Sequence, residues 1–152
     1  MLNSEILRNN LEVYNNSIFP MQIIMLAVAI VLTYFLFSKP GSMVNKLIKA
    51  YLAFVFAWAG LIFPIYGFSK IIFTIYHLVL ASLFIIDIFR VKIEFKLPET
   101  NGKKYFVLFL IISAFVLYLL IEYIAGHSYP RIPLFGVAPC PTIIFSLELL
   151  IG

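Results

Sequence analysis

The sequence predicts an all-α protein, a polytopic transmembrane helix bundle with four full spans and a short or truncated fifth. Of its 152 residues, 63 % are hydrophobic and 12 % are charged, whereas a soluble domain carries roughly 25 % charged residues. The mean hydropathy is +1.05. The apolar residues form runs that approach the ~20 residues needed to cross the hydrocarbon core of a bilayer. We therefore expect a multi-pass protein of the cell membrane that has the lipid bilayer as a partner.

Residues 1–18 precede the first long apolar run and contain a short amphipathic segment. Ser4 is a suitable N-cap, and apolar side chains recur at helical spacing up to Tyr14. This segment is too polar to span a bilayer, so we expect an interfacial helix in the headgroup region. A frayed tail is the alternative.

Four apolar segments are long enough to span, at about residues 20–38, 47–68, 71–89 and 105–125. A cluster of helix breakers, Lys39-Pro40-Gly41-Ser42, ends the first. Pro64 predicts a kink in the last turns of the second, because its ring removes a backbone hydrogen bond. Residues 91–97 alternate apolar and charged side chains, which suits either a strand on the membrane surface or a linker between spans.

The last apolar segment, residues 142–152, is too short to be a complete span. Its eleven residues would form a helix of roughly 16 Å, about half the thickness of a hydrocarbon core of roughly 30 Å. Either the chain is a piece of a longer protein, or this helix inserts half-way and packs against its neighbours. We favour the first interpretation.

The lysine and arginine residues predict the orientation of the bundle. Eight of the eleven lie in residues 39–49 and 90–104, and three lie at the opposite ends of the spans. Because loops rich in these residues stay in the cytoplasm, we place 39–49 and 90–104 there. The N-terminus and the loop 126–141 then face outward. No basic stripe follows a helix, so nucleic acid is not an expected partner.

The outward loop is the most distinctive part of the chain, because it interrupts the apolar pattern with prolines, a histidine and the single cysteine. Four prolines fix four φ angles and remove four donors, which predicts a semi-rigid loop. We take these residues as candidates for a functional loop: His127, Tyr129, Pro130, Pro133, Gly136, Pro139, Cys140, Pro141 and Thr142.

Cys140 precedes Pro141, which suits the first position of a helix. At the N-cap, the helix dipole would favour a thiolate, so one interpretation is a reactive or metal-binding cysteine. The alternative, which we favour, is a small apolar residue packed in the loop. His127 and Cys140 are too few for a structural zinc site, and adding Glu122 matches no metal motif. We expect no metal and no cofactor.

Polar residues inside spans are candidates for function because an unpaired charge there is costly. The candidates are His77, Glu122, Glu148 and Trp58. We expect His77 to be a hydrogen-bonded packing residue, and Trp58 to face another helix that accepts its indole N–H. A proton or cation path through His77, Glu122, Glu148 and His127 is the alternative.

Ion pairs near the ends of the spans would reduce the cost of burying their charges. Asp87 and Arg90 are spaced for an i,i+3 pair. Glu122 could pair with Arg131 or His127, and the hydroxyl of Tyr118 could hydrogen-bond the same carboxylate.

No nucleotide-binding, zinc-protease or serine-hydrolase motif occurs, and nothing argues for an enzyme. The string from Gly126 to Pro130, followed by Pro133–Gly136 and Pro139–Phe145, resembles the signature of domain-of-unknown-function family 6064. This is a family of mainly bacterial multi-spanning membrane proteins. The resemblance covers the whole chain and implies about six spans, so the chain looks C-terminally truncated. Glu148 departs from the family pattern, and no activity is implied.

We therefore expect a structural or interaction subunit whose outward His/Pro/Cys loop docks a protein partner, joins a homo-oligomer or folds back into its own bundle. The first alternative is a small proton- or cation-coupled transporter or channel. The second is an outward-facing thiol or metal site.

Overall fold

The computed structural model describes residues 4–67, 71–95 and 101–151. Within these ranges some side chains lie outside the description: Ser4, Asn101, Lys103, Lys104, Ala114, Tyr118, Pro139, Glu148, Leu150 and Ile151. The predictions made for the side chains of Glu148 and Tyr118 therefore lie outside the described residues. The same holds for residues 96 and 97 of the predicted surface strand.

The described elements are all helical, which confirms the predicted fold class. In chain order they are α1 (Ser4–Ser17), α2 (Met21–Ser38), α3 (Ser42–Leu61), the 3₁₀ turn η1 (Phe63–Tyr66), α4 (Ile71–Arg90), α5 (Asn101–Ile112), the π-helical turn η2 (Ser113–Leu117), α6 (Tyr118–Ile124) and α7 (Pro139–Ile151). Among the described residues, four segments are long and apolar enough to cross a membrane: Met21–Ser38, Ser42–Tyr66, Ile71–Arg90 and Tyr105–Ile124.

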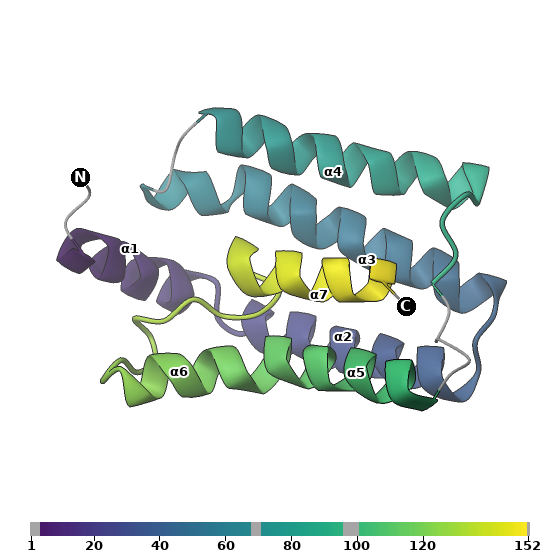
Figure 1. Cartoon of the computed structure of the whole chain (residues 1–152). Coiled ribbons are helices and arrows are strands. Elements are labelled where there is room, and N and C mark those ends of the chain that lie inside the picture. The colour runs from purple at the N-terminus through teal and green to yellow at the C-terminus, as the bar shows by residue number, and fades with distance from the viewer. Residues whose placement is uncertain (1–3, 68–70, 96–100, 152) are drawn as a thin grey trace.

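The long helices run side by side, with α3 near the middle of the bundle (Figure 1). Helix α4 packs along α3, and α7 lies between α3 and the rod formed by α5, η2 and α6. Helix α1 packs against η1 at the end of the bundle where the chain leaves α6. Helix α3 is accordingly the most enclosed of the four segments: 56 % of its most apolar stretch is buried inside the structure, against 12 % for Tyr105–Ile124.

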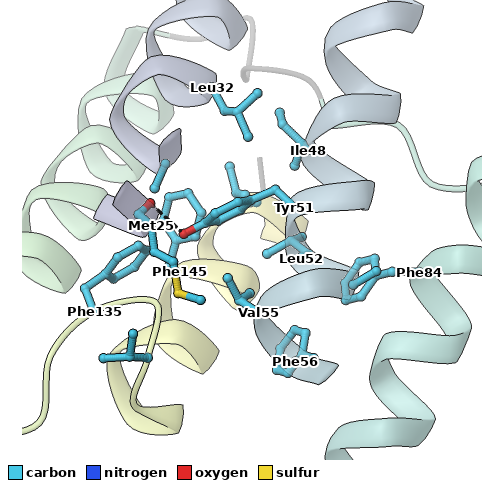
Figure 2. Packing of buried hydrophobic residues seen from close by; sticks show 14 of the residues in the cluster. Met25, Leu32, Ile48, Tyr51, Leu52, Val55, Phe56, Phe84, Phe135 and Phe145 are labelled. Carbon is cyan, nitrogen blue, oxygen red and sulfur yellow. Dashed lines mark hydrogen bonds between the residues drawn. The ribbon is translucent and has the colours of Figure 1, made fainter. Parts of the chain in front are cut away.

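Apolar side chains of α3 form the centre of the core. Leu52 and Val55 are fully buried, and Phe56 stacks on Phe84 of α4 with ring centroids 5.8 Å apart. Figure 2 shows these side chains meeting those of α2, α4 and the segment before α7. Gly60 lets α4 approach, because an added Cβ would lie 3.1 Å from the Cβ of His77.

Helix α3 differs from the predicted segment at both ends. It begins at Ser42, the last residue of the breaker cluster, so Lys46 and Lys49 lie on the helix rather than in a loop. It ends at Leu61 and continues as η1. Pro64 therefore produces a change to a 3₁₀ turn instead of a kink, because proline cannot donate the next helical hydrogen bond.

The rod α5–η2–α6 contains a π-helical turn that the sequence pattern did not predict. In the first residue of this turn, the hydroxyl of Ser113 donates to the carbonyl of Phe109 at 2.8 Å. Side-chain hydroxyls that bond back to the preceding turn are known to bend helices. Single π turns of this kind occur mostly as local interruptions of α-helices.

Candidate functional site: the cap segment and the strap

Residues 126–138, here called the cap segment, fold back into the bundle. Val137 and Ala138 are almost completely buried. The Tyr14 hydroxyl of α1 donates to the carbonyl of Val137 at 2.7 Å, and the Trp58 indole N–H of α3 donates to the Tyr14 hydroxyl at 2.9 Å. One hydroxyl thus joins α1, α3 and the cap segment. The acceptor expected for Trp58 is therefore on α1.

Burial raises the pKa of Tyr14 well above its ordinary value of 10.0, and the hydrogen bond from Trp58 opposes this rise only in part. The hydroxyl consequently stays protonated at neutral pH. A protonated hydroxyl is what the contact needs, because it must donate to Val137 while it accepts from Trp58.

The proline-rich half of the cap segment offers more carbonyl acceptors than N–H donors, and α1 supplies the missing donors. The side-chain amide nitrogen of Asn15 donates to the carbonyls of Pro130 at 2.6 Å and Ile132 at 2.8 Å. Gln22, at the start of α2, donates to the backbone carbonyl of Asn15 at 2.6 Å. Pro133 lies between these contacts and Gly136 and is half-buried.

Gly136 marks the point where the cap segment touches the core. Its φ is +79°, and an added Cβ would lie 2.7 Å from the Cβ of Met25. Its N–H donates to the hydroxyl of Thr142 at 3.1 Å, which in turn donates to the carbonyl of Ala138 at 2.7 Å. Figure 2 shows the neighbouring Phe135 directed into the same cluster. A glycine and a buried threonine together make this turn possible.

Charged side chains join α1 to the end of α6 and the cap segment. Glu122 accepts from His127 at 3.0 Å and lies 3.8 Å from Arg8. Arg131 does not pair with Glu122; its Nε lies 2.7 Å from Glu12. Of the two charged partners predicted for Glu122, the structure thus gives His127, and it adds Arg8 of α1, which was not among the predicted partners.

Cys140 is exposed and not in a disulfide, so the favoured interpretation of a small apolar residue packed in the loop is wrong. Helix α7 begins at Pro139, so Cys140 lies in the first turn rather than at the N-cap, and Pro141 is buried beside it. Among the side chains that the structure describes, no group of three His, Cys, Asp or Glu residues could hold a metal ion.

The remaining candidate from the apolar segments with a described side chain, His77, is packed among aromatic rings, and its Nε2 has no hydrogen-bond partner among the described residues. It is 1 % exposed, and its Nδ1 lies 2.8 Å from the carbonyl of Phe73. The ring of Phe73 lies 4.0 Å from the imidazole ring, between centroids. The ring of Phe56 also contacts it. These contacts fit the hydrogen-bonded helix-packing role that was expected.

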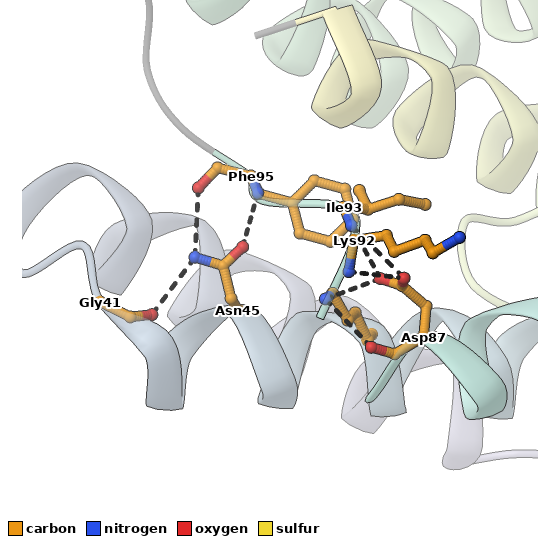
Figure 3. Close-up of polar contacts among 7 residues, drawn as sticks. Gly41, Asn45, Asp87, Lys92, Ile93 and Phe95 are labelled. Carbon is orange, nitrogen blue, oxygen red and sulfur yellow. Dashed lines mark hydrogen bonds and ion pairs between the residues drawn. The ribbon is translucent and has the colours of Figure 1, made fainter. Parts of the chain in front are cut away.

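The opposite end of the bundle carries a buried ion pair. The ammonium of Lys49, on α3, lies 2.7 Å from the carboxylate of Asp87, on α4, and the Lys49 side chain is fully buried. The same carboxylate accepts the backbone N–H groups of Lys92 and Ile93 (Figure 3). The predicted pair with Arg90 is therefore wrong, because the carboxylate points into the bundle, where Lys49 supplies the counter-charge.

Residues 91–95, here called the strap, form no strand in the part of the segment that the structure describes. Asn45 replaces the missing strand partner: its side-chain oxygen accepts the N–H of Phe95, and its nitrogen donates to the carbonyl of Phe95 at 3.3 Å (Figure 3). Val91 begins the strap with φ +47°, which is unusual for a β-branched residue. The turn brings the following N–H groups to Asp87.

The sequence interpretation missed this arrangement, although a signal was present. Lys49 lies near the start of one apolar segment and Asp87 near the end of the next. Adjacent antiparallel helices would place the two opposite charges at one depth. The positive-inside rule assigns Lys49 to the loop 39–49, and this assignment hides its pairing with Asp87.

The fold and the two ends of the bundle define a class: a protein whose described elements are all helical, with four described segments long and apolar enough to cross a membrane. The chain belongs to the family of unknown function DUF6064, whose model matches residues 4–152. The family predicted from the loop signature is thereby confirmed. No curated protein and no solved structure matches the chain.

Proposed function

We propose that this protein is a multi-pass integral membrane protein that acts as a structural or interaction subunit. The cap segment closes its extracytoplasmic end and the strap closes its cytoplasmic end. The bilayer covers the outer faces of α2, α4 and the α5–α6 rod. This assignment explains why so many large apolar side chains are exposed there, for example Ile72, Phe109 and Ile124.

The observation that carries the proposal is that polar groups of the cap segment are bonded within the chain. Tyr14, Asn15 and Thr142 all bond to its backbone from within the chain. The charges of Glu122 and Arg131 are also matched by groups of α1 and the cap segment. Such a cap is a fixed closure of the bundle. His77 and Trp58 likewise have packing roles, which favours a subunit over a transporter.

A partner subunit is most easily accommodated on the α5–α6 rod, because this is the least buried of the four spanning segments. A photoreactive benzoylphenylalanine at Leu120, which is exposed on α6, should form a discrete protein adduct in cells. The matched position is Leu83, exposed on α4. If both positions yield only lipid adducts, or if both form the same adducts, the subunit role is wrong.

A further inference from the structure

We infer that the groove between α2, η2, α6 and the cap segment binds an amphiphile with one apolar chain and a neutral hydroxyl head. The inference rests on the proposed membrane location. The groove has a volume of about 270 Å³ and is lined by Phe19, Gln22, Ile23, Leu26, Phe115, Leu119, Tyr129, Leu134 and Phe135. This volume is close to the lower limit of roughly 300 Å³ for small-molecule sites, so it fits one chain rather than two.

The lining of the groove selects for an uncharged ligand. Among the described residues that line it, none is charged, and apart from Gln22 and Tyr129 all carry apolar side chains. An ionised headgroup would find no counter-charge there and would lose its hydration. A neutral hydroxyl head on a hydrocarbon chain needs no counter-charge, and its loss of hydration costs less than that of an ionised group.

Gln22 supplies the feature that asks for a hydrogen-bond donor. It is only 4 % exposed, and its side-chain oxygen is buried without a partner. The orientation of the amide is set by its nitrogen, which donates to the carbonyl of Asn15 at 2.6 Å. Rotating the amide by half a turn would bring two oxygens together, so this oxygen must remain the acceptor. A buried acceptor that lacks a donor is unfavourable, and a ligand hydroxyl would satisfy it.

The order of polarity along the groove matches the orientation of a lipid. Gln22 lies in the first turn of α2, and Tyr129 lies on the cap segment, at the end that we place toward the outer headgroups. Leu26 lies one turn further along α2, and Phe115 lies more than two turns before the end of α6. A hydroxyl at Gln22 would therefore direct its chain toward Phe115 and the membrane centre.

A second hollow adjoins the groove and extends toward the cap end of α6. It has a volume of about 500 Å³ and shares Phe115, Leu119, Tyr129 and Leu134 with the groove. The two hollows flank Tyr129 and Leu134.

A competition experiment tests the inference without any mutation. The purified full-length chain in detergent micelles is loaded with tritiated hexadecanol, and unlabelled hexadecanol is compared with hexadecyl methyl ether as competitor. The ether has a similar chain but cannot donate a hydrogen bond. The alcohol should displace the label at a concentration about tenfold lower, which corresponds to one hydrogen bond of about 1.4 kcal/mol. Equal displacement by both compounds overturns the inference and leaves a buried water as the donor to Gln22.

Two variants locate the site. Leu119→Trp should fill the groove and lower hexadecanol binding at least about tenfold, whereas Leu83→Trp, on the exposed face of α4, should not. Gln22→Met, if it folds, should bind both competitors alike. Undiminished binding in Leu119→Trp overturns the location. Failure of the proposed membrane location would look different, because the chain would then be recovered from the soluble fraction without membranes.

Discussion

At the scale of single residues, the pair of Lys49 and Asp87 should dominate the stability of the strap end. Removing one partner leaves a buried, uncompensated charge, which typically costs about 3–5 kcal/mol. Lys49→Met should therefore lower the midpoint of thermal unfolding in detergent strongly. Lys46→Met, on the same helix but exposed, should change it little. The double variant Lys49→Met/Asp87→Asn should recover part of the loss, because no charge remains buried. Equal effects of Lys49→Met and Lys46→Met would contradict the buried pair.

Tyr14 makes a second prediction, about pH. Because burial raises the pKa of the folded-state hydroxyl above its ordinary value of 10.0, its contribution to stability is fully present below pH 10 and is lost as the pH rises further. Trp58 is the single tryptophan, so its fluorescence reports on this contact.

Above pH 10, the midpoint temperature of thermal unfolding should decrease in the unsubstituted protein. In Tyr14→Phe this decrease should be smaller. At neutral pH the free energy of unfolding of the variant should already be lower by about 1–3 kcal/mol, because the carbonyl of Val137 loses its donor. An identical pH profile in both proteins would show that Tyr14 is not the titrating group.

At the scale of elements, the junction of the cap segment with α2 rests on Gly136. Gly136 and Gly126 share a positive φ, +79° and +81°, but only Gly136 faces Met25; nothing lies within 4 Å of a Cβ added at Gly126. Gly126→Ala should cost about 1–2 kcal/mol from backbone strain alone. Gly136→Ala should cost about 1–3 kcal/mol more, from overpacking. Chemical unfolding of the two variants in detergent measures the difference, and equal losses would mean that the cap segment is not packed on α2.

The elements themselves could largely be predicted from hydropathy and helix breakers, because both act locally along the chain. The long helices follow from apolar runs. The end of α3 at Leu61 does not, because Pro64 predicted a kink within the span and not a change to a 3₁₀ turn. What local patterns could not give is the partner of each polar side chain. Asn45 pairs with a backbone 50 residues away, and Asn15 with carbonyls more than 100 residues away.

The candidate site shows the same division. The proline-rich segment could be singled out from composition, and its family from its signature. The sequence could not show that α1 supplies the donors for this segment, because Tyr14 and Asn15 are residues that any interfacial helix can contain. The pairing of Glu122 with Arg8 depends in the same way on how α1 packs, which no spacing rule encodes.

At the scale of the whole molecule, the two ends of the bundle are closed by different chemistry. The cap end uses side chains of α1 to satisfy a backbone rich in proline. The strap end uses a buried ion pair and an asparagine side chain that bonds both backbone groups of Phe95. Between them the outer faces are apolar and exposed. This separation of polar ends from apolar sides is the pattern that a bilayer imposes on helical proteins.

Topology in cells tests the proposed membrane location most directly. Three candidate spans lie between Ser42, the first residue of α3, and Ser128, in the cap segment, so a membrane-spanning chain must place these two residues on opposite sides. In a Cys140→Ser background, a membrane-impermeant maleimide should label Ser128→Cys in intact cells, and Ser42→Cys only after permeabilisation. Both serines are exposed in the structure, so burial in the protein does not block the reagent. Labelling of both positions in intact cells, or of neither until permeabilisation, would contradict the proposal.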